Sequence, residues 1–354
     1  MAEAKFSDRL LSWFDQYGRK DLPWQQQSSY HVWVSEIMLQ QTQVKTVIPY
    51  YLRFIVRFPS VKKLAAASID EVLHHWSGLG YYARGRNLHR TAQIICREHD
   101  TKLPNTLEQW INLPGIGRST AAAILSLSKN QRQPILDGNV KRVLSRCFGI
   151  RGWPGISAVE QRLWDISEQQ TPTRRVANYT QAIMDLGATV CTRSKPLCHL
   201  CPMNKHCVAF KTESVTLYPG KKPKRTLPEK HTIMLLLRNK QNEILLQQRP
   251  PSGIWGGLWC FPQCDVETDV SQWCQQQLGL GIDNILNGIP FSHTFSHYRL
   301  YVTPIHAQVT GNSETVMEGA PQLWYNRQQP ASLGLAAPVS KLLQQLNYAL
   351  FGKL

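Results

Sequence analysis

The feature that most constrains the fold of this chain is a group of four closely spaced cysteines, Cys191-x6-Cys198-x2-Cys201-x5-Cys207. The other five cysteines are scattered. Because structural disulfides are rare in the cytosol, four grouped thiols in an intracellular chain favour a metal site over disulfides. Zinc and an iron–sulfur cluster both accept four cysteines, so the residues alone leave both metals open. The group therefore predicts a loop that is pinned by a metal centre.

The hydrophobic pattern changes once along the 354 residues, a length that suggests two to three domains. Residues 1–211 carry apolar side chains mainly at helical spacing. Residues 212–230 are basic and rich in proline, as in a linker. His231–Asn239 and Glu243–Gln248 then form short apolar runs typical of a β-hairpin. We expect a mainly α N-terminal part and a smaller α+β domain over 231–354.

The charge is distributed unevenly between these parts. The net charge is +16, whereas residues 231–354 hold seven basic and seven acidic side chains. A basic excess confined to residues 1–230 indicates contact with phosphates, although charge that only maintains solubility is the alternative. No apolar run approaches the roughly 18 residues of a membrane helix, and the first residues lack a signal-peptide core. We therefore expect a soluble cytoplasmic protein.

A glycine-containing turn lies between two expected helices at Leu113-Pro-Gly-Ile-Gly117. Gly115 and Gly117 allow a tight turn and let backbone N–H groups approach a ligand closely. The N-terminus of the next helix adds its dipole, which makes an anion site suited to a DNA phosphate. With the Arg118-Ser-Thr-Ala sequence that follows, the pattern is that of a helix-hairpin-helix motif over about residues 105–128.

The helix-hairpin-helix motif, Asp137 and the cysteine group together resemble the endonuclease III superfamily of DNA repair glycosylases. The resemblance implies one [4Fe–4S] cluster on the four cysteines. Members that cut the DNA strand use a lysine in the second hairpin helix, where this chain has Ser119. Because a hydroxyl group cannot form a Schiff base, we expect a monofunctional glycosylase.

Five further segments resemble the MutY family within this superfamily, and the likeness runs through nearly the whole chain. Members of that family remove adenine mispaired with 8-oxoguanine or guanine in duplex DNA. The resemblance implies a monomeric base excision repair enzyme at the nucleoid, with other repair or replication proteins as additional partners. The segments are Leu22-Pro-Trp24, Val34-Ser-Glu-Ile-Met-Leu-Gln-Gln-Thr42, Gly78-Leu-Gly-Tyr-Tyr-Ala-Arg84, Ile135-Leu-Asp-Gly-Asn-Val-Lys-Arg142 and Met184-Asp-Leu-Gly187.

Two carboxylates are the candidates for the chemistry. Glu36 has mostly apolar neighbours in an expected helix, and burial there would keep it protonated near neutral pH. Asp137 stands where it can cap the next helix, and N–H donors there would keep its carboxylate ionised. One neutral and one charged acid suit cleavage of a glycosidic bond. The alternatives are an exposed helix Glu and a purely structural cap.

The resemblance also implies how the base is reached, because an adenine inside a duplex must be flipped out. Gln41 and Tyr81 would wedge into the base stack, although core packing is the alternative for Tyr81. The residues that would line or border the adenine pocket are Trp24, Asn139, Gln181 and Ser119.

The second domain resembles a Nudix-type domain from Ser252 onward, but the glutamate-rich helix that holds Mg²⁺ in that family is missing. We expect a Nudix-like fold that serves recognition. Phe295, Ser296 and His297 match the loop with which the MutY family senses 8-oxoguanine, although an ordinary turn is the alternative. Two other functions stay open: a non-catalytic DNA-binding protein with a structural cluster, and a nucleotide pyrophosphohydrolase.

Overall fold

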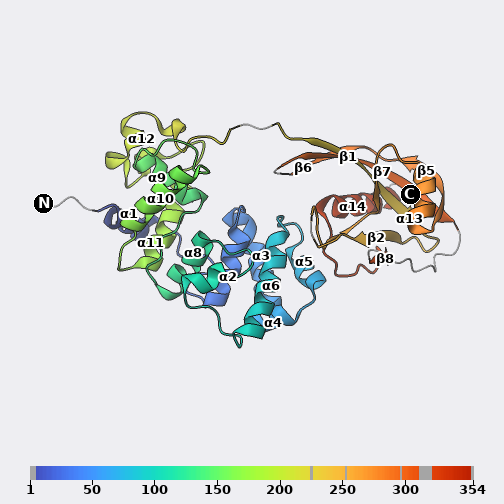
Figure 1. The fold of residues 1–354 in the computed structure, drawn as a ribbon, viewed down its shortest axis with the longest axis horizontal. Coiled ribbons are helices and arrows are strands. Elements are labelled where there is room, and N and C mark those ends of the chain that lie inside the picture. Colours follow the sequence, from blue (N-terminus) through green and yellow to red (C-terminus); the bar gives the residue numbers. More distant parts are fainter. Residues whose placement is uncertain (1–4, 224–225, 252, 296, 311–320, 352–354) are drawn as a thin grey trace. The chain divides into compact units, whose positions relative to one another are not determined.

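The computed structural model describes residues 5–223, 226–251, 253–295, 297–310 and 321–351 (Figure 1). The chain forms two compact units. Met1–Ala66 and Asn87–Lys224 make a helical unit, and Ala67–Arg86 and Arg225–Leu354 make a unit with a sheet. The mainly α and α+β parts predicted from the sequence are both present. Within the described residues, no helix is both long enough and apolar enough to span a membrane.

One large apolar core of the helical unit joins side chains of the first helix, such as Leu10 and Phe14, to buried side chains of residues 122–218. Short π- and 3₁₀-helical turns, η1 to η4, follow its last long helix. The elements are α1 (Phe6–Tyr17), α2 (Ser29–Leu39), α3 (Val44–Arg57), α4 (Val61–Ala66), α6 (Ala83–Glu98), α7 (Leu107–Ile111), α8 (Arg118–Lys129), α9 (Gly138–Cys147), α10 (Ser157–Gln170), α11 (Val176–Asp185), η1 (Leu186–Val190), η2 (Cys198–Leu200), η3 (Asn204–His206), α12 (Val208–Lys211) and η4 (Val215–Leu217).

Helix α2 lies at the centre of this unit because it is apolar on nearly all sides. Val32, Trp33 and Val34 are buried, and Trp33 packs against Trp110 of α7 with ring centroids 5.7 Å apart. Glu36 is the only acidic residue within α2, so the helix carries a carboxyl group into the interior.

The predicted helix-hairpin-helix is formed by α7 and α8. The Thr106 side chain accepts a hydrogen bond from Gln109 N, and the Gln109 side chain binds back to the backbone of Thr106, which completes a capping box. Gly115 has a φ of +76°, and a Cβ atom there would lie 2.8 Å from Asn87 Cβ. Gly117 differs from this, because its φ is −90° and a Cβ atom would meet nothing within 4 Å.

The second unit is built around one mixed sheet with the strand order β3-β2-β1-β7-β5. The predicted hairpin is formed by β1 and β2, and β1 also pairs in parallel with β7. The elements are α5 (Ile69–Trp76), β1 (Glu229–Arg238), β2 (Ile244–Gln248), β3 (Trp259–Cys260), β4 (Gln263–Cys264), α13 (Val270–Leu278), β5 (Gly281–Asn287), β6 (Phe291–Thr294), β7 (Arg299–Thr310), β8 (Gln322–Tyr325) and α14 (Ala337–Phe351).

Both faces of this sheet are covered, because successive side chains of a strand point to opposite faces. Ile233, Leu235 and Leu237 of β1 pack with α13, whereas Met234 and Leu236 enter a second apolar core with α14.

The observed units differ from the predicted boundaries at two segments. Residues 67–86 fall within the predicted domain 1–211 but pack in the second unit, because Leu73 of α5 belongs to the same apolar core as α14. The predicted linker 212–230 begins too early, because Tyr218 is 7% exposed and packs in the helical core. Gly220 N also donates to Gly152 O at 3.0 Å, which holds this end of the segment on the helical unit.

Candidate active site

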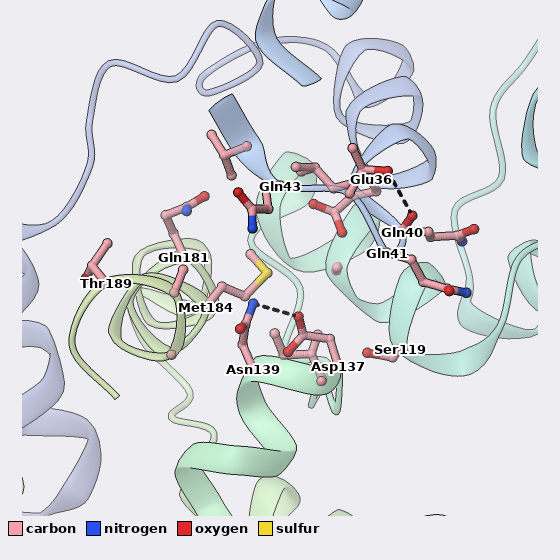
Figure 2. A pocket seen from close by; sticks show the side chains of 18 of the residues that line it. Glu36, Gln40, Gln41, Gln43, Ser119, Asp137, Asn139, Gln181, Met184 and Thr189 are labelled. Carbon is pink, nitrogen blue, oxygen red and sulfur yellow. Dashed lines mark hydrogen bonds between the residues drawn. The ribbon is translucent and has the colours of Figure 1, made fainter. Parts of the chain in front are cut away.

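A cavity of about 800 Å³ opens in the helical unit between α2, α8, α9 and α11 (Figure 2). It gathers side chains from segments that are far apart in the sequence. Of the residues predicted from the sequence, those that line it are Trp24, Glu36, Gln41, Ser119, Asp137, Asn139 and Gln181.

Glu36 presents a carboxyl group to this cavity from the buried helix α2. Its surface is partly exposed to the cavity, while protein surrounds the rest of the side chain. Burial, and to a smaller degree the charge of Asp137, raise the pKa of Glu36 from 4.5 to about 8. No hydrogen bond to the Glu36 side chain is formed by the described residues. The carboxyl group is thus protonated at neutral pH and free to donate its proton.

Asp137 is the N-cap of α9, as predicted, and its Oδ1 accepts a hydrogen bond from Val140 N at 2.8 Å. Its Oδ2 accepts a longer bond from Asn139 Nδ2 at 3.4 Å. Burial raises the pKa of Asp137, and the hydrogen bonds from Val140 and Asn139 lower it by less. The hydrogen bonds of the cap alone would lower the pKa of Asp137 and stabilise its ionised form. Because the pKa is raised overall, burial of this carboxylate outweighs the cap.

Asn139 connects Asp137 to the cysteine loop through Arg142. The Arg142 guanidinium donates to Asn139 Oδ1 at 2.8 Å, to Gly187 O at 2.6 Å and to Cys191 O at 2.7 Å. These contacts fix the orientation of the Asn139 amide, whose nitrogen faces Asp137.

Ser119 lies in the first turn of α8, and its Oγ accepts a hydrogen bond from Leu136 N at 3.0 Å. The side chain lines the cavity without supplying an amine. Among the described residues that line the cavity, the one lysine is Lys45, at the exposed start of α3. Gly117 caps α8, and the open space beside it leaves room for a ligand at the N-terminus of the helix.

The two residues predicted to wedge into DNA share an uncommon backbone conformation. Gln41 has a φ of +59° and Tyr81 a φ of +50°, and both side chains are exposed. Left-handed backbone in residues other than glycine is strained and collects at functional sites. Tyr82, in contrast, donates its hydroxyl to Leu335 O at 3.3 Å and is partly buried. The alternative of packing in the core therefore applies to Tyr82 and not to the exposed Tyr81.

The four clustered cysteines line a second cavity in the helical unit, beside η1 and η4. Buried Arg146 holds this region together, because its guanidinium donates to Thr192 O at 2.7 Å and to Cys191 Sγ at 3.4 Å. The described residues contain no group of three His, Cys, Asp or Glu side chains placed to hold a single metal ion. The thiols are Cys191, Cys198, Cys201 and Cys207.

In the second unit, Phe295 follows β6 and lies in an aromatic cluster. Its ring stacks on Tyr298 at 4.8 Å and packs near Trp255 at 5.3 Å. His297 is exposed beside this cluster, at 6.3 Å from the Phe295 ring. Ser296 lies outside the described residues.

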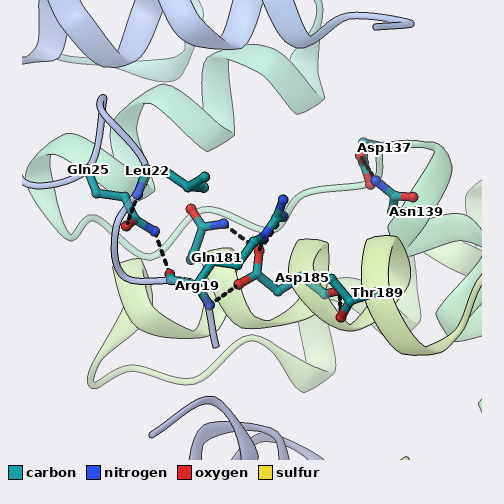
Figure 3. Close-up of polar contacts among 8 residues, drawn as sticks. All are labelled: Arg19, Leu22, Gln25, Asp137, Asn139, Gln181, Asp185 and Thr189. Atoms are coloured by element: carbon teal, nitrogen blue, oxygen red, sulfur yellow. Dashed lines mark hydrogen bonds and ion pairs between the residues drawn. The ribbon is translucent and has the colours of Figure 1, made fainter. Parts of the chain in front are cut away.

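Among the residues near the first cavity that were not predicted from the sequence, three are polar or flexible side chains beside Gln181. Arg19 and Met184 line the cavity, and Asp185 lies behind Gln181 (Figure 3). The signal for Asp185 was its spacing of four from Gln181, which puts both side chains on one face of a helix.

Two family models match this chain. One describes an HhH-GPD superfamily base excision DNA repair protein and matches residues 34–169, and the other describes a NUDIX domain and matches residues 233–345. These matches confirm the predicted fold classes of both parts.

Similar proteins cover the whole chain. The adenine DNA glycosylase of Buchnera aphidicola subsp. Acyrthosiphon pisum is 42% identical over 99% of this chain and 100% of its own length. The adenine DNA glycosylase of Mus musculus is 34% identical over 83% of this chain and 69% of its own length.

Two solved structures share the helical fold. A thermostable thymine-DNA glycosylase has a TM-score of 0.53 at 24% identity, covering 58% of this chain and 95% of that one. A non-covalent endonuclease III–DNA complex has a TM-score of 0.51 at 18% identity, covering 58% of this chain and 94% of that one.

Proposed function

Because this chain belongs to the MutY family of adenine DNA glycosylases, we propose that it excises adenine mispaired with 8-oxoguanine or guanine without cutting the DNA strand. The observation that carries this proposal is the shared cavity of Glu36 and Asp137, in which one carboxyl group has a pKa of about 8. Base excision repair of DNA is the activity of the family, and the mispair and the residue roles are the proposed part.

The two acids divide the work at the glycosidic bond. Protonated Glu36 donates its proton to N7 of the flipped adenine, so the base leaves as a neutral molecule. Asp137, as the carboxylate, stabilises the positive charge that develops on the deoxyribose. Ionised Glu36 then takes a proton from the attacking water, which restores its starting state. Ser119 contributes no amine, so the abasic sugar stays in an intact strand.

DNA is held by groups that carry no base information and by groups that enter the stack. The open N-terminus of α8 behind Gly117 receives a phosphate. Exposed Gln41 and Tyr81 fill the space that the flipped base leaves. Trp24 and Asn139 border the adenine. The 8-oxoguanine is contacted by the second unit, through the consecutive residues Phe295, Ser296 and His297.

The second unit serves recognition in this proposal, rather than nucleotide hydrolysis. Helix α13 has the sequence VSQWCQQQL, which contains no carboxylate to hold Mg²⁺. Release of pyrophosphate from a modified deoxynucleoside triphosphate would contradict this assignment.

We expect free adenine from duplexes that carry adenine opposite 8-oxoguanine or guanine, and none from an adenine–thymine pair. Strand breaks should appear only after hot alkali. Alkali cleaves the strand at an abasic site, whereas an enzyme that forms no Schiff base leaves the strand intact. The measurement follows released base and strand length in parallel. Breaks without alkali would contradict the monofunctional assignment, and no release from any duplex would leave a DNA-binding protein.

The four cysteines fit a [4Fe–4S] cluster, which would hold the loop between η1 and α12. All four thiols line one cavity. Four thiols could hold zinc or such a cluster, and the resemblance to the endonuclease III superfamily favours the cluster. The cluster would supply structural support to the loop that Arg142 and Arg146 bind.

Replacing Cys198 with Ser should lower the iron and acid-labile sulfide bound per chain and weaken binding to duplex DNA. Cys96→Ser is the matched control, because Cys96 lies in α6 and lines neither cavity. Metal analysis and DNA binding are the two measurements. Zinc in place of iron in the unaltered protein would contradict the cluster.

A further inference from the structure

A buried carboxylate that the proposed chemistry does not use lies behind the adenine cavity. Asp185 is the last residue of α11 and is 1% exposed. Its Oδ1 accepts from Arg19 Nε at 2.9 Å and from Arg19 Nη2 at 2.5 Å, and its Oδ2 accepts from Arg19 N at 2.8 Å. Burying a charge is costly unless it is paired and hydrogen-bonded, and Arg19 meets both conditions.

Asp185 also binds Gln181, one helical turn earlier on α11. Gln181 Nε2 donates to Asp185 Oδ1 at 2.8 Å, as Figure 3 shows. An ionised carboxylate only accepts hydrogen bonds, so the amide atom that faces it has to be the nitrogen. The amide oxygen of Gln181 therefore points the other way, and no described residue donates to it. Gln181 is 6% exposed and lines the cavity.

The position of Arg19 is itself fixed by the loop that carries Trp24. The Gln25 side chain donates to Arg19 O at 2.8 Å and accepts from Leu22 N at 3.1 Å. A chain of hydrogen bonds thus runs from this loop through Arg19 and Asp185 to the Gln181 amide.

We propose that Asp185, held by Arg19, is a positioning residue that keeps the Gln181 amide oxygen turned toward the cavity. An acceptor at this wall selects a purine with an exocyclic amino group and rejects one with a carbonyl oxygen at the same place. A buried acceptor that meets another acceptor is left unpaired, which is how sites built for a hydrogen bond discriminate strongly. This inference rests on the proposed excision of adenine and adds what sets the choice of base.

The test compares Asp185→Asn with the unaltered enzyme on two duplexes, with adenine or hypoxanthine opposite 8-oxoguanine. Hypoxanthine carries a carbonyl oxygen where adenine carries its amino group. The amide introduced at position 185 can present either its oxygen or its nitrogen to Gln181. The Gln181 amide can therefore rotate and turn its nitrogen, a hydrogen-bond donor, toward the cavity. We expect the single-turnover rate ratio, adenine over hypoxanthine, to fall by about tenfold or more. The ratio does not depend on the fraction of active enzyme, so partial misfolding does not imitate the effect.

Asp15→Asn is the matched control, because Asp15 forms an ion pair of the same kind with Arg175 at 2.5 Å and does not line the cavity. It should leave the ratio unchanged. If Asp185→Asn does not fold, Arg19→Lys, which keeps the cation but lacks the forked donor, should lower the ratio in the same direction.

Equal losses on both substrates would show that Asp185 only supports the fold, and would overturn the inference while the proposed function stands. If the unaltered enzyme releases no adenine, the proposed function and this inference fail together.

Discussion

Replacing Glu36 with Gln is expected to lower adenine release by at least about 100-fold while DNA binding is retained. Gln has nearly the same shape but cannot give a proton to the leaving base. Single-turnover release from an adenine–8-oxoguanine duplex measures the loss, and a binding titration on the same duplex measures retention. Glu98→Gln is the control, because it makes the same substitution at a side chain that is 51% exposed.

The pH dependence follows from the same group. Because the pKa of Glu36 is about 8, the rate should fall as pH rises through 8 and the acid loses its proton. On the acid side the rate should fall when Asp137, whose pKa is also raised, takes up a proton. The plot of rate against pH should therefore be bell-shaped, and its two apparent pKa values belong to the coupled pair of carboxyl groups. A flat profile between neutral pH and pH 9 would contradict the role of Glu36.

Stability gives an independent check of the same pKa. The folded pKa of Glu36 lies above the ordinary value of 4.5, so the folded state holds this proton more tightly than the unfolded state does. Its stabilising contribution is complete below pH 4.5 and is lost as pH rises through about 8. The melting temperature of Glu36→Gln, relative to that of the unaltered protein, should therefore rise between pH 5 and pH 9.

The parts of the site that depend on short segments could be predicted from the sequence. Asp137 precedes a helix and caps it, and the Thr106 box opens α7, because capping is decided by residues three apart. Glu36 stands in a run of apolar residues that had to be buried. In each case the physical cause lies within one turn of the helix.

What could not be predicted depends on which surfaces meet. Arg19 and Asp185 are 166 residues apart, and nothing local in either segment indicates the other. The apolar face of α5 would fit either core, and only the packing assigns Leu73 to the second unit. The raised pKa of Asp137 has the same origin, because the sequence shows its cap but not how much protein covers it.

Replacing Asp137 with Asn should also lower adenine release by at least about 100-fold, because the amide carries no charge to stabilise the cationic sugar. Asn caps helices about as well as Asp, and its Oδ1 can accept from Val140 N as Asp137 does now. The variant should therefore fold and bind mispaired DNA. Asp269→Asn is the matched control: Asp269 caps α13 through Gln272 N at 2.9 Å, on the exterior of the second unit.

The stability of Asp137→Asn separates a catalytic role from a purely structural cap. Since burial raises the pKa of Asp137, the folded state holds the proton more tightly, and stability from this group is lost as pH rises through the folded pKa. Asn carries no buried charge, so the variant should be more stable than the unaltered protein at neutral pH although its activity is lost. If Asp137 served only as a cap, Asp137→Asn would show neither the loss of activity nor the gain in stability. Retained activity in Asp137→Asn would mean that the charge of Asp137 has no part in the reaction, and a fall in stability would mean that its capping outweighs the cost of its burial.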